Sequence, residues 1–213
     1  MSKMNSDVTN NTDELSQVRA ASEAGEGQLG EFLEQHRSRL RRLVDLRIDP
    51  RVRGRVDASD VVQDTHIEAF GRINEYLANP EVPLFVWLRF LALQKVAQCH
   101  RKHLGTQARD AAREISLHRN SVPAATSAAL AAQLVGQLTT ASQAAVRAEV
   151  KLRLEQALNA MEQIDREILS LRHFEQLSRK ETANVLGIEE NTAGVRHMRA
   201  LARLRKVLNK QEE

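Results

Sequence analysis

Apolar residues recur at helical spacing in three stretches of the N-terminal half of the chain. In residues 28–47 the apolar positions follow one another at steps of three, four and seven, and arginines fill the other face. The same period marks residues 58–76, which begin behind the candidate capping residue Asp57, and residues 84–103, which end in a basic turn. Prolines interrupt the pattern between these stretches, so it predicts three separate helices.

The C-terminal half repeats the helical pattern after a change in composition. A second periodic block runs from about residue 147 to residue 209, and no strand-like alternation of useful length occurs in the sequence. Residues 120–146 carry no charged side chain and are rich in alanine, a shift that marks an interdomain linker. The sequence therefore predicts an all-α chain of two small helical domains joined by a flexible linker. The expected parts are a disordered acidic tail at 1–27, a first domain at 28–104, the linker at 105–150 and a second domain at 151–210.

Composition mainly excludes classes of protein. The 213-residue chain has one cysteine and so cannot form an internal disulfide, which fits a reducing compartment. The sequence contains no run of about 18 apolar residues, so it predicts no membrane span. The N-terminus also lacks the basic start and apolar stretch of a signal peptide. We therefore expect a cytoplasmic protein that does not enter a membrane.

The charges are segregated along the chain, although the net charge is only +3. Residues 37–55 carry eight arginines against two aspartates, and residues 191–210 carry six basic side chains and no acid. Basic blocks at separate places indicate a polyanion that is contacted at several points, and nucleic acid is the usual one. A set of solvated helix faces is the alternative interpretation.

The strongest local pattern lies at residues 177–204. Ser178 followed by Glu181 forms a capping box that starts a short helix, and Gly187 suits a turn with positive φ. A second helix with a basic face begins near Glu190. This order is typical of a helix-turn-helix, whose second helix lies in the major groove of DNA, whereas an ordinary helical hairpin is the alternative. The candidate DNA-reading residues are Glu190, Asn191, Thr192, Arg196, Arg199 and Arg203.

No grouping of residues predicts catalysis or a metal site. Cys99, His100 and His103 are close in sequence, but neighbouring helical positions do not face one side, and zinc takes four ligands. Asp60 and Asp64 share a helix face without a partner base or an oxyanion donor. The sequence therefore predicts a protein that is not an enzyme and that has no cofactor.

Both periodic blocks resemble the extracytoplasmic-function group of bacterial RNA polymerase sigma factors, over about 28–104 and 155–208. Residues 164–172 look like the helix before the family's helix-turn-helix, and residues 60–65 match the acidic motif that starts its polymerase-docking helix. Trp87, Leu88 and Ala92 match the helix that meets the promoter −10 element. Further matches in the helix-turn-helix are Leu177, Ser178, Glu181, Ala183, Leu186, Gly187, Ile188, Thr192, Arg196, Arg199 and Ala200.

The resemblance implies a sigma factor, which binds core RNA polymerase and directs promoter-specific initiation of transcription. The first domain would dock on the polymerase and hold the −10 element, and the second would read the −35 element as duplex DNA. The partners would be core RNA polymerase and promoter DNA, and an anti-sigma protein is a further candidate. The implied polymerase-binding residues are Asp60, Val61, Gln63, Asp64 and Ile67. The implied −10 residues are Asn79, Trp87, Arg89, Gln94, Lys95, Gln98, Arg101 and Lys102, of which Trp87 also fits a core position.

The sequence departs from the family pattern in places. Gln94 stands where the family usually has Asn, and Gln98 where it often has Asp. Ala193-Gly194 replaces a valine and a basic residue, and Gly194 costs the helix about 1 kcal/mol of stability. Two other functions therefore stay open: a helix-turn-helix regulator that binds an operator without polymerase, and a helical adaptor whose basic faces meet an acidic protein.

Overall fold

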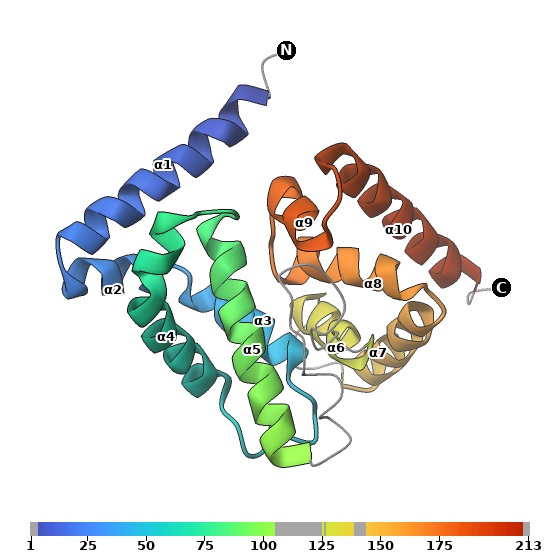
Figure 1. The fold of residues 1–213 in the computed structure, drawn as a ribbon. Helices are drawn as coiled ribbons and strands as arrows, with labels where there is room; N and C mark the ends of the chain where they lie inside the picture. Colours follow the sequence, from blue (N-terminus) through green and yellow to red (C-terminus); the bar gives the residue numbers. More distant parts are fainter. Residues whose placement is uncertain (1–3, 105–124, 126, 139–143, 211–213) are drawn as a thin grey trace. The chain divides into compact units, whose positions relative to one another are not determined.

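The computed structural model describes residues 4–104, 125, 127–138 and 144–210, and over these residues it consists of helices and connecting turns (Figure 1). No strand occurs in this part of the chain, which confirms the predicted all-α fold. The chain divides into two compact units, Met1–Pro123 and Ala124–Glu213. Within the described residues, no helix combines the length and the apolar character that a membrane span requires.

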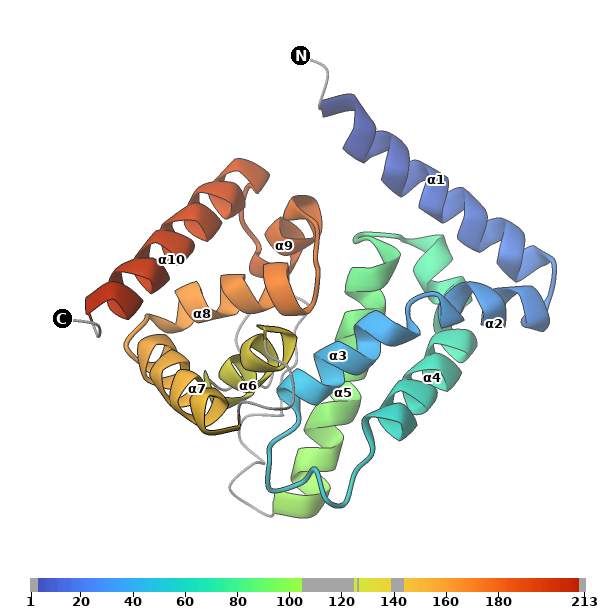
Figure 2. The same cartoon turned by 180° about the vertical axis from the view of Figure 1, so that it is seen from behind.

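The first unit is a bundle in which α3, α4 and α5 pack against one another (Figures 1 and 2). Its core is built from the apolar stripes seen in the sequence, and Leu40, Val62 and Leu88 are all fully buried there. Burial of a side chain of this size contributes about 1.5–3 kcal/mol, so this core holds the three helices together. The helices of the unit are α1 (Met4–Glu23), α2 (Glu26–Glu34), α3 (Arg37–Arg47), α4 (Ala58–Ala78) and α5 (Leu84–Leu104).

The single helix predicted at 28–47 is wrong, because the chain turns between α2 and α3. The amide of His36 donates to the carbonyl of Leu33 at 3.0 Å, an i to i−3 bond that tightens the turn there. The ring of His36 then lies between Phe32 and Phe85, with ring centroids 6.0 and 5.9 Å away. The apolar spacing continues through this turn, which is why periodicity alone did not reveal it.

Where the sequence predicts a disordered tail at 1–27, the structure has the helix α1 and the start of α2. Val18 and Ala21 of α1 are buried, and α1 contacts both α2 and α4. Arg19 donates from Nη2 to the carbonyl oxygen of Leu77 near the end of α4, at 2.9 Å. The polar composition conceals this apolar side, because Val18 and Ala21 alone do not make a recognisable stripe.

The second unit consists of α6 (Ser127–Leu138), α7 (Ala144–Asn159), α8 (Gln163–Leu169), the π-helical turn η3 (Ser170–Phe174), α9 (Arg179–Leu186) and α10 (Glu190–Lys210). Helices α8, α9 and α10 pack together, and α6 packs on α7. Part of the linker predicted at 105–150 is therefore helical, and Leu130 of α6 is fully buried. The alanine-rich composition that suggested a linker also has a high helix propensity. The rest of that linker, 105–124, 126 and 139–143, lies outside the described residues.

Candidate functional site

The helix-turn-helix forms from the local signals that the sequence carries. Ser178 accepts a hydrogen bond at Oγ from the amide of Glu181 at 3.1 Å, and the Glu181 carboxylate accepts from the amide of Ser178 at 2.6 Å. These reciprocal bonds confirm the capping box that begins α9. Gly187 ends α9 with φ 60° and ψ 42°, in the left-handed region where glycine is favoured. The chain then enters α10 at Glu190.

Small residues bring α10 close to the helices beneath it. Ala193 and Ala200 of α10 and Ala183 of α9 are all buried. An ion pair also fastens α10, because Arg203 contacts the buried carboxylate of Asp165 on α8. Arg203 was predicted to contact DNA, but the structure places its guanidinium in this pair, which compensates the buried charge of Asp165.

Gly194 on α10 lies beneath an arginine side chain from α9. A Cβ atom at Gly194 would lie 3.3 Å from Nε of Arg179 and 3.5 Å from its Cζ. Glycine at this position therefore lets the side chain of Arg179 lie close across the backbone of α10. The family pattern has a basic residue where this chain has Gly194. In this structure α9 supplies a cation beside that position, the guanidinium of Arg179.

Two histidines connect α10 to η3. The Nε2 atoms of His173 and His197 lie 2.8 Å apart, so one ring donates and the other accepts. Burial lowers the pKa of both rings, and the nearby positive charge of Arg172 lowers each further. The pair is therefore held in the neutral form, and it fixes the middle of α10 to the turn before α9.

The outward face of α10 is polar except at its centre. Three of the predicted DNA-reading residues are exposed: Asn191, Thr192 and Arg199. Two others, Glu190 and Arg196, are half-buried. Val195 lies among them with 49% of its surface exposed, and Met198 with 65%. Sequence reasoning missed these two apolar residues. A helical wheel of α10 could have found Val195, because it places this residue on the opposite side from Ala193 and Ala200.

In the first unit, four of the five residues predicted to bind polymerase share one face of α4. Asp57 caps this helix, because its Oδ1 accepts from the amide of Ser59 at 2.7 Å. Asp60, Gln63, Asp64 and Ile67 follow at steps of three, four and seven and are all exposed. Val61 is different: only 3% of its surface is exposed, and it belongs to the core of the bundle.

The predicted −10 residues divide into a surface group and a held group. Gln94, Gln98, Arg101 and Lys102 lie at positions i, i+4, i+7 and i+8, which places them on one side of α5. Gln98 and Lys102 are exposed, and the other two are half-buried.

The held group consists of Arg89, Lys95 and Trp87. Arg89 is buried, and Lys95 pairs with Glu68 of α4, with Nζ and Oε2 2.6 Å apart. Trp87 is buried and stacks on Tyr76, with ring centroids 4.9 Å apart. This is the core position that the sequence offered as its second interpretation.

The loop before α5 carries the remaining −10 residue, Asn79. Its side chain is exposed, and Nδ2 donates to the carboxylate of Glu81 at 2.9 Å. Tyr76 fixes the same loop, because its hydroxyl donates to the carbonyl oxygen of Val82 at 2.9 Å. The buried tyrosine thus connects α4, the loop and, through its stacked ring, Trp87 of α5.

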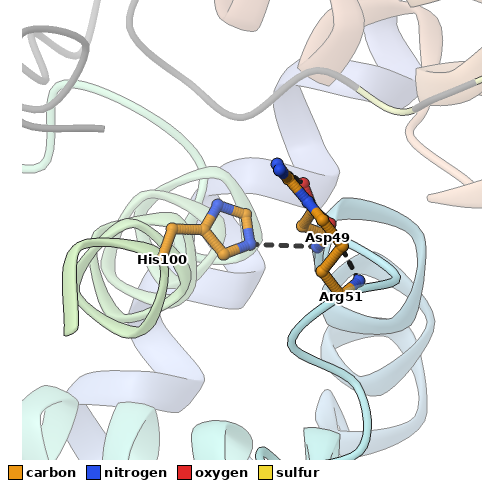
Figure 3. A network of polar contacts seen from close by, with 3 residues as sticks. All are labelled: Asp49, Arg51 and His100. Atoms are coloured by element: carbon orange, nitrogen blue, oxygen red, sulfur yellow. Dashed lines mark hydrogen bonds and ion pairs between the residues drawn. The ribbon is translucent and has the colours of Figure 1, made fainter. Parts of the chain in front are cut away.

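The basic end of α5 is joined to the loop between α3 and α4 by a polar network (Figure 3). His100 accepts at Nε2 from the amide of Asp49 at 3.0 Å, so that nitrogen carries no proton. The carboxylate of Asp49 accepts from Nε and Nη2 of Arg51 at 3.0 and 2.8 Å, and these bonds lower the pKa of Asp49 to about 2. Burial lowers the pKa of His100. Among the described residues, no three His, Cys, Asp or Glu side chains gather as metal ligands would.

Comparison with known proteins agrees with this geometry. Residues 151–204 match the family model for Sigma-70, region 4, and this segment contains α8, α9 and most of α10. No curated protein matches the chain significantly. Among solved structures, the fold is similar to that of CnrH in the structure of CnrH in complex with the cytosolic domain of CnrY. That similarity has a TM-score of 0.52 and 21% sequence identity, and it covers 92% of this chain and 97% of CnrH. The family match supports the predicted resemblance to sigma factors in the second unit, and the similarity to CnrH supports the predicted all-α fold.

Proposed function

We propose that this protein is a sigma factor that binds core RNA polymerase and directs initiation at promoters with two sequence elements. The observation that carries the proposal is the match of residues 151–204 to Sigma-70, region 4, on a helix-turn-helix with a basic recognition helix. A sigma factor has no catalytic role of its own. The enzyme in this reaction is the polymerase, and this chain supplies recognition.

The second unit would read the −35 element as duplex DNA. The outward face of α10 offers Asn191, Thr192 and Arg199 to base edges and phosphates, and residues 191–210 include no acid that would repel the backbone. Amide, hydroxyl and guanidinium groups are the usual partners of base edges in the major groove. The inner-face contacts of α10 leave these residues available.

The first unit would bind the polymerase through the exposed stripe on α4. Asp60, Gln63 and Asp64 surround one side of Ile67, which has 64% of its surface exposed. An exposed apolar residue ringed by polar groups is a typical anchor of a protein interface, because a partner can bury it while the rim excludes water. This stripe is separate from the core residues that hold the bundle together.

The −10 element would meet the surface group of α5 and the loop that carries Asn79. Arg101 and Lys102 give this end of α5 a positive charge that suits a single-stranded phosphate backbone. Gln94 and Gln98 provide amides on the same side, able to donate to and accept from an unpaired base. The held residues Arg89 and Lys95 would position this surface instead of contacting DNA.

Partner and location follow from this function. Promoter DNA and core polymerase would be met in the cytoplasm. CnrH forms its complex with the cytosolic domain of CnrY, and this favours a protein of the anti-sigma kind as a further partner of the present chain.

Transcription reconstitution tests the proposal. The purified full chain is mixed with bacterial core RNA polymerase and a library of genomic DNA, and the 5′ ends of the transcripts are sequenced. We expect start sites that require the chain and share two upstream elements. The matched variant Asn191→Ala/Arg199→Ala should lose initiation while still binding core polymerase, because it alters only the exposed face of α10.

Two outcomes would point elsewhere. Binding to duplex DNA without any dependence on polymerase would favour the operator-binding regulator. Binding to neither DNA nor polymerase, with the polymerase of the source organism included, would favour the helical adaptor.

A further inference from the structure

The centre of the outward face of α10 is occupied by a branched apolar side chain. An α-helix turns about 100° per residue, so Val195 lies about 160° around the helix from Ala193 and about 140° from Ala200. Those two alanines are buried against the neighbouring helices and define the inner side of α10. Val195 thus points away from the body of the second unit, as does Met198 three residues further along.

The surroundings of Val195 are those of a DNA-reading surface. Asn191 and Thr192 lie one turn before it and Arg199 lies one turn after it, all three exposed. If α10 enters the major groove of a duplex, Val195 lies between these polar groups on the side that faces the bases. With 49% of its surface exposed, it has apolar area that a partner can still bury.

A valine can distinguish bases in only one way. The valine side chain neither donates nor accepts a hydrogen bond, so it cannot read the donor and acceptor pattern of the major groove. The one apolar group in that groove is the C5 methyl of thymine. We propose that Val195 contacts a thymine methyl of the −35 duplex and makes recognition of that element depend on thymine at one or two positions. This inference rests on the proposed function and names the chemical group that the site reads.

The size of the effect follows from the area of one methyl group. Removing a methyl that is buried against an apolar side chain costs about as much as removing one buried methylene, which corresponds to about a fourfold change in Kd. Replacing thymine by deoxyuridine removes this methyl and leaves base pairing and every hydrogen-bonding group in place. The substitution therefore isolates the contact that Val195 would make.

The test uses the full chain bound to core polymerase and a promoter duplex obtained from the transcription library. Each thymine of the upstream element is replaced in turn by deoxyuridine, and Kd is measured by fluorescence anisotropy. We expect one or two positions at which deoxyuridine weakens binding about fourfold. In Val195→Ala these positions should become insensitive, whereas Val195→Ile should keep the sensitivity.

Ile164→Ala is the matched control, because Ile164 is an exposed β-branched residue of the same unit that belongs to α8 and not to the outward face of α10. It should retain the full deoxyuridine effect. The proposal is overturned if no thymine is sensitive in the unaltered chain, if Val195→Ala keeps the sensitivity, or if only Met198→Ala removes it. A flat deoxyuridine series on a tightly bound promoter would refute the role of Val195 alone, whereas failure to obtain any promoter would refute the proposed function and this inference with it.

Discussion

Two residues of α4, Val61 and Ile67, are both among the predicted polymerase-binding residues but differ sharply in exposure. Val61 exposes 3% of its surface and Ile67 exposes 64%. Replacing each by alanine should therefore change different quantities. Val61→Ala removes two buried carbons and leaves a cavity, so the free energy of unfolding should fall by about 2 kcal/mol. Ile67→Ala removes carbons that are mostly in water already, and stability should change by less than about 1 kcal/mol.

Binding to core polymerase should show the opposite order. Ile67→Ala removes three carbon groups, of which about two-thirds of the surface is exposed in the free chain. If the partner buries this exposed part, the variant loses the contacts of about two such groups. At about 0.8 kcal/mol for each group, this amounts to about 1.5 kcal/mol and a Kd raised roughly tenfold. Val61→Ala should bind with nearly unchanged affinity at a temperature where the first unit remains folded, because Val61 does not reach the surface.

Urea unfolding followed by circular dichroism measures the first quantity, and competition with a labelled copy of the chain for core polymerase measures the second. Gln63→Ala serves as a control on the rim of the same stripe, where a smaller loss of affinity is expected. The reasoning fails if Ile67→Ala binds normally. It also fails if Val61→Ala, shown to be folded, loses as much affinity as Ile67→Ala.

Four further substitutions test the local physics of the sites by urea unfolding. Ser178→Ala should lower the stability of the second unit by about 1 kcal/mol, because it removes a capping bond of α9, and an unchanged midpoint would contradict the role of the cap. Gly194→Ala should raise stability by up to about 1 kcal/mol, since the exposed side chain of Arg179 can move aside, whereas Gly187→Ala should lower it by about 1 kcal/mol at its positive φ. Burial lowers the pKa of His100 below 6.5, so the unfolded chain binds more protons and stability should fall as pH falls below about 6.5. His100→Ala should reduce this slope between pH 7 and pH 5, and an equal slope in both proteins would refute it.

The sequence predicted those parts of the fold whose causes are local. The capping box at Ser178 and the glycine turn at Gly187 each need only a few neighbouring residues, and both occur as predicted. The apolar stripes of α4 and α5 likewise reflect the period of a single helix. The exposed stripe of α4 was instead implied by the family resemblance, and the structure exposes all of its predicted residues except Val61.

What the sequence could not predict depends on contacts between elements. Arg203 and Lys95 look like any other basic residues of an amphipathic helix until Asp165 and Glu68 are brought beside them by packing. The helix α1 is stabilised through contacts with α2 and α4, and its own polar composition gives no sign of them. Residues that pair across the fold are hard to separate by sequence pattern from residues that are free to bind DNA.

The contacts that hold α10 show how a recognition helix can be rigid and still leave its reading face free. The helix is held at two points along its length besides its buried alanines: His197 meets His173, and Arg203 pairs with Asp165 of α8. Neither contact uses Asn191, Thr192, Val195 or Arg199. Binding of a duplex therefore need not break any of these contacts. The free energy of binding then carries little cost for rearranging α10. Substitutions on the inner side should consequently alter the stability and presentation of α10, whereas substitutions on the outward side should alter which sequence it reads.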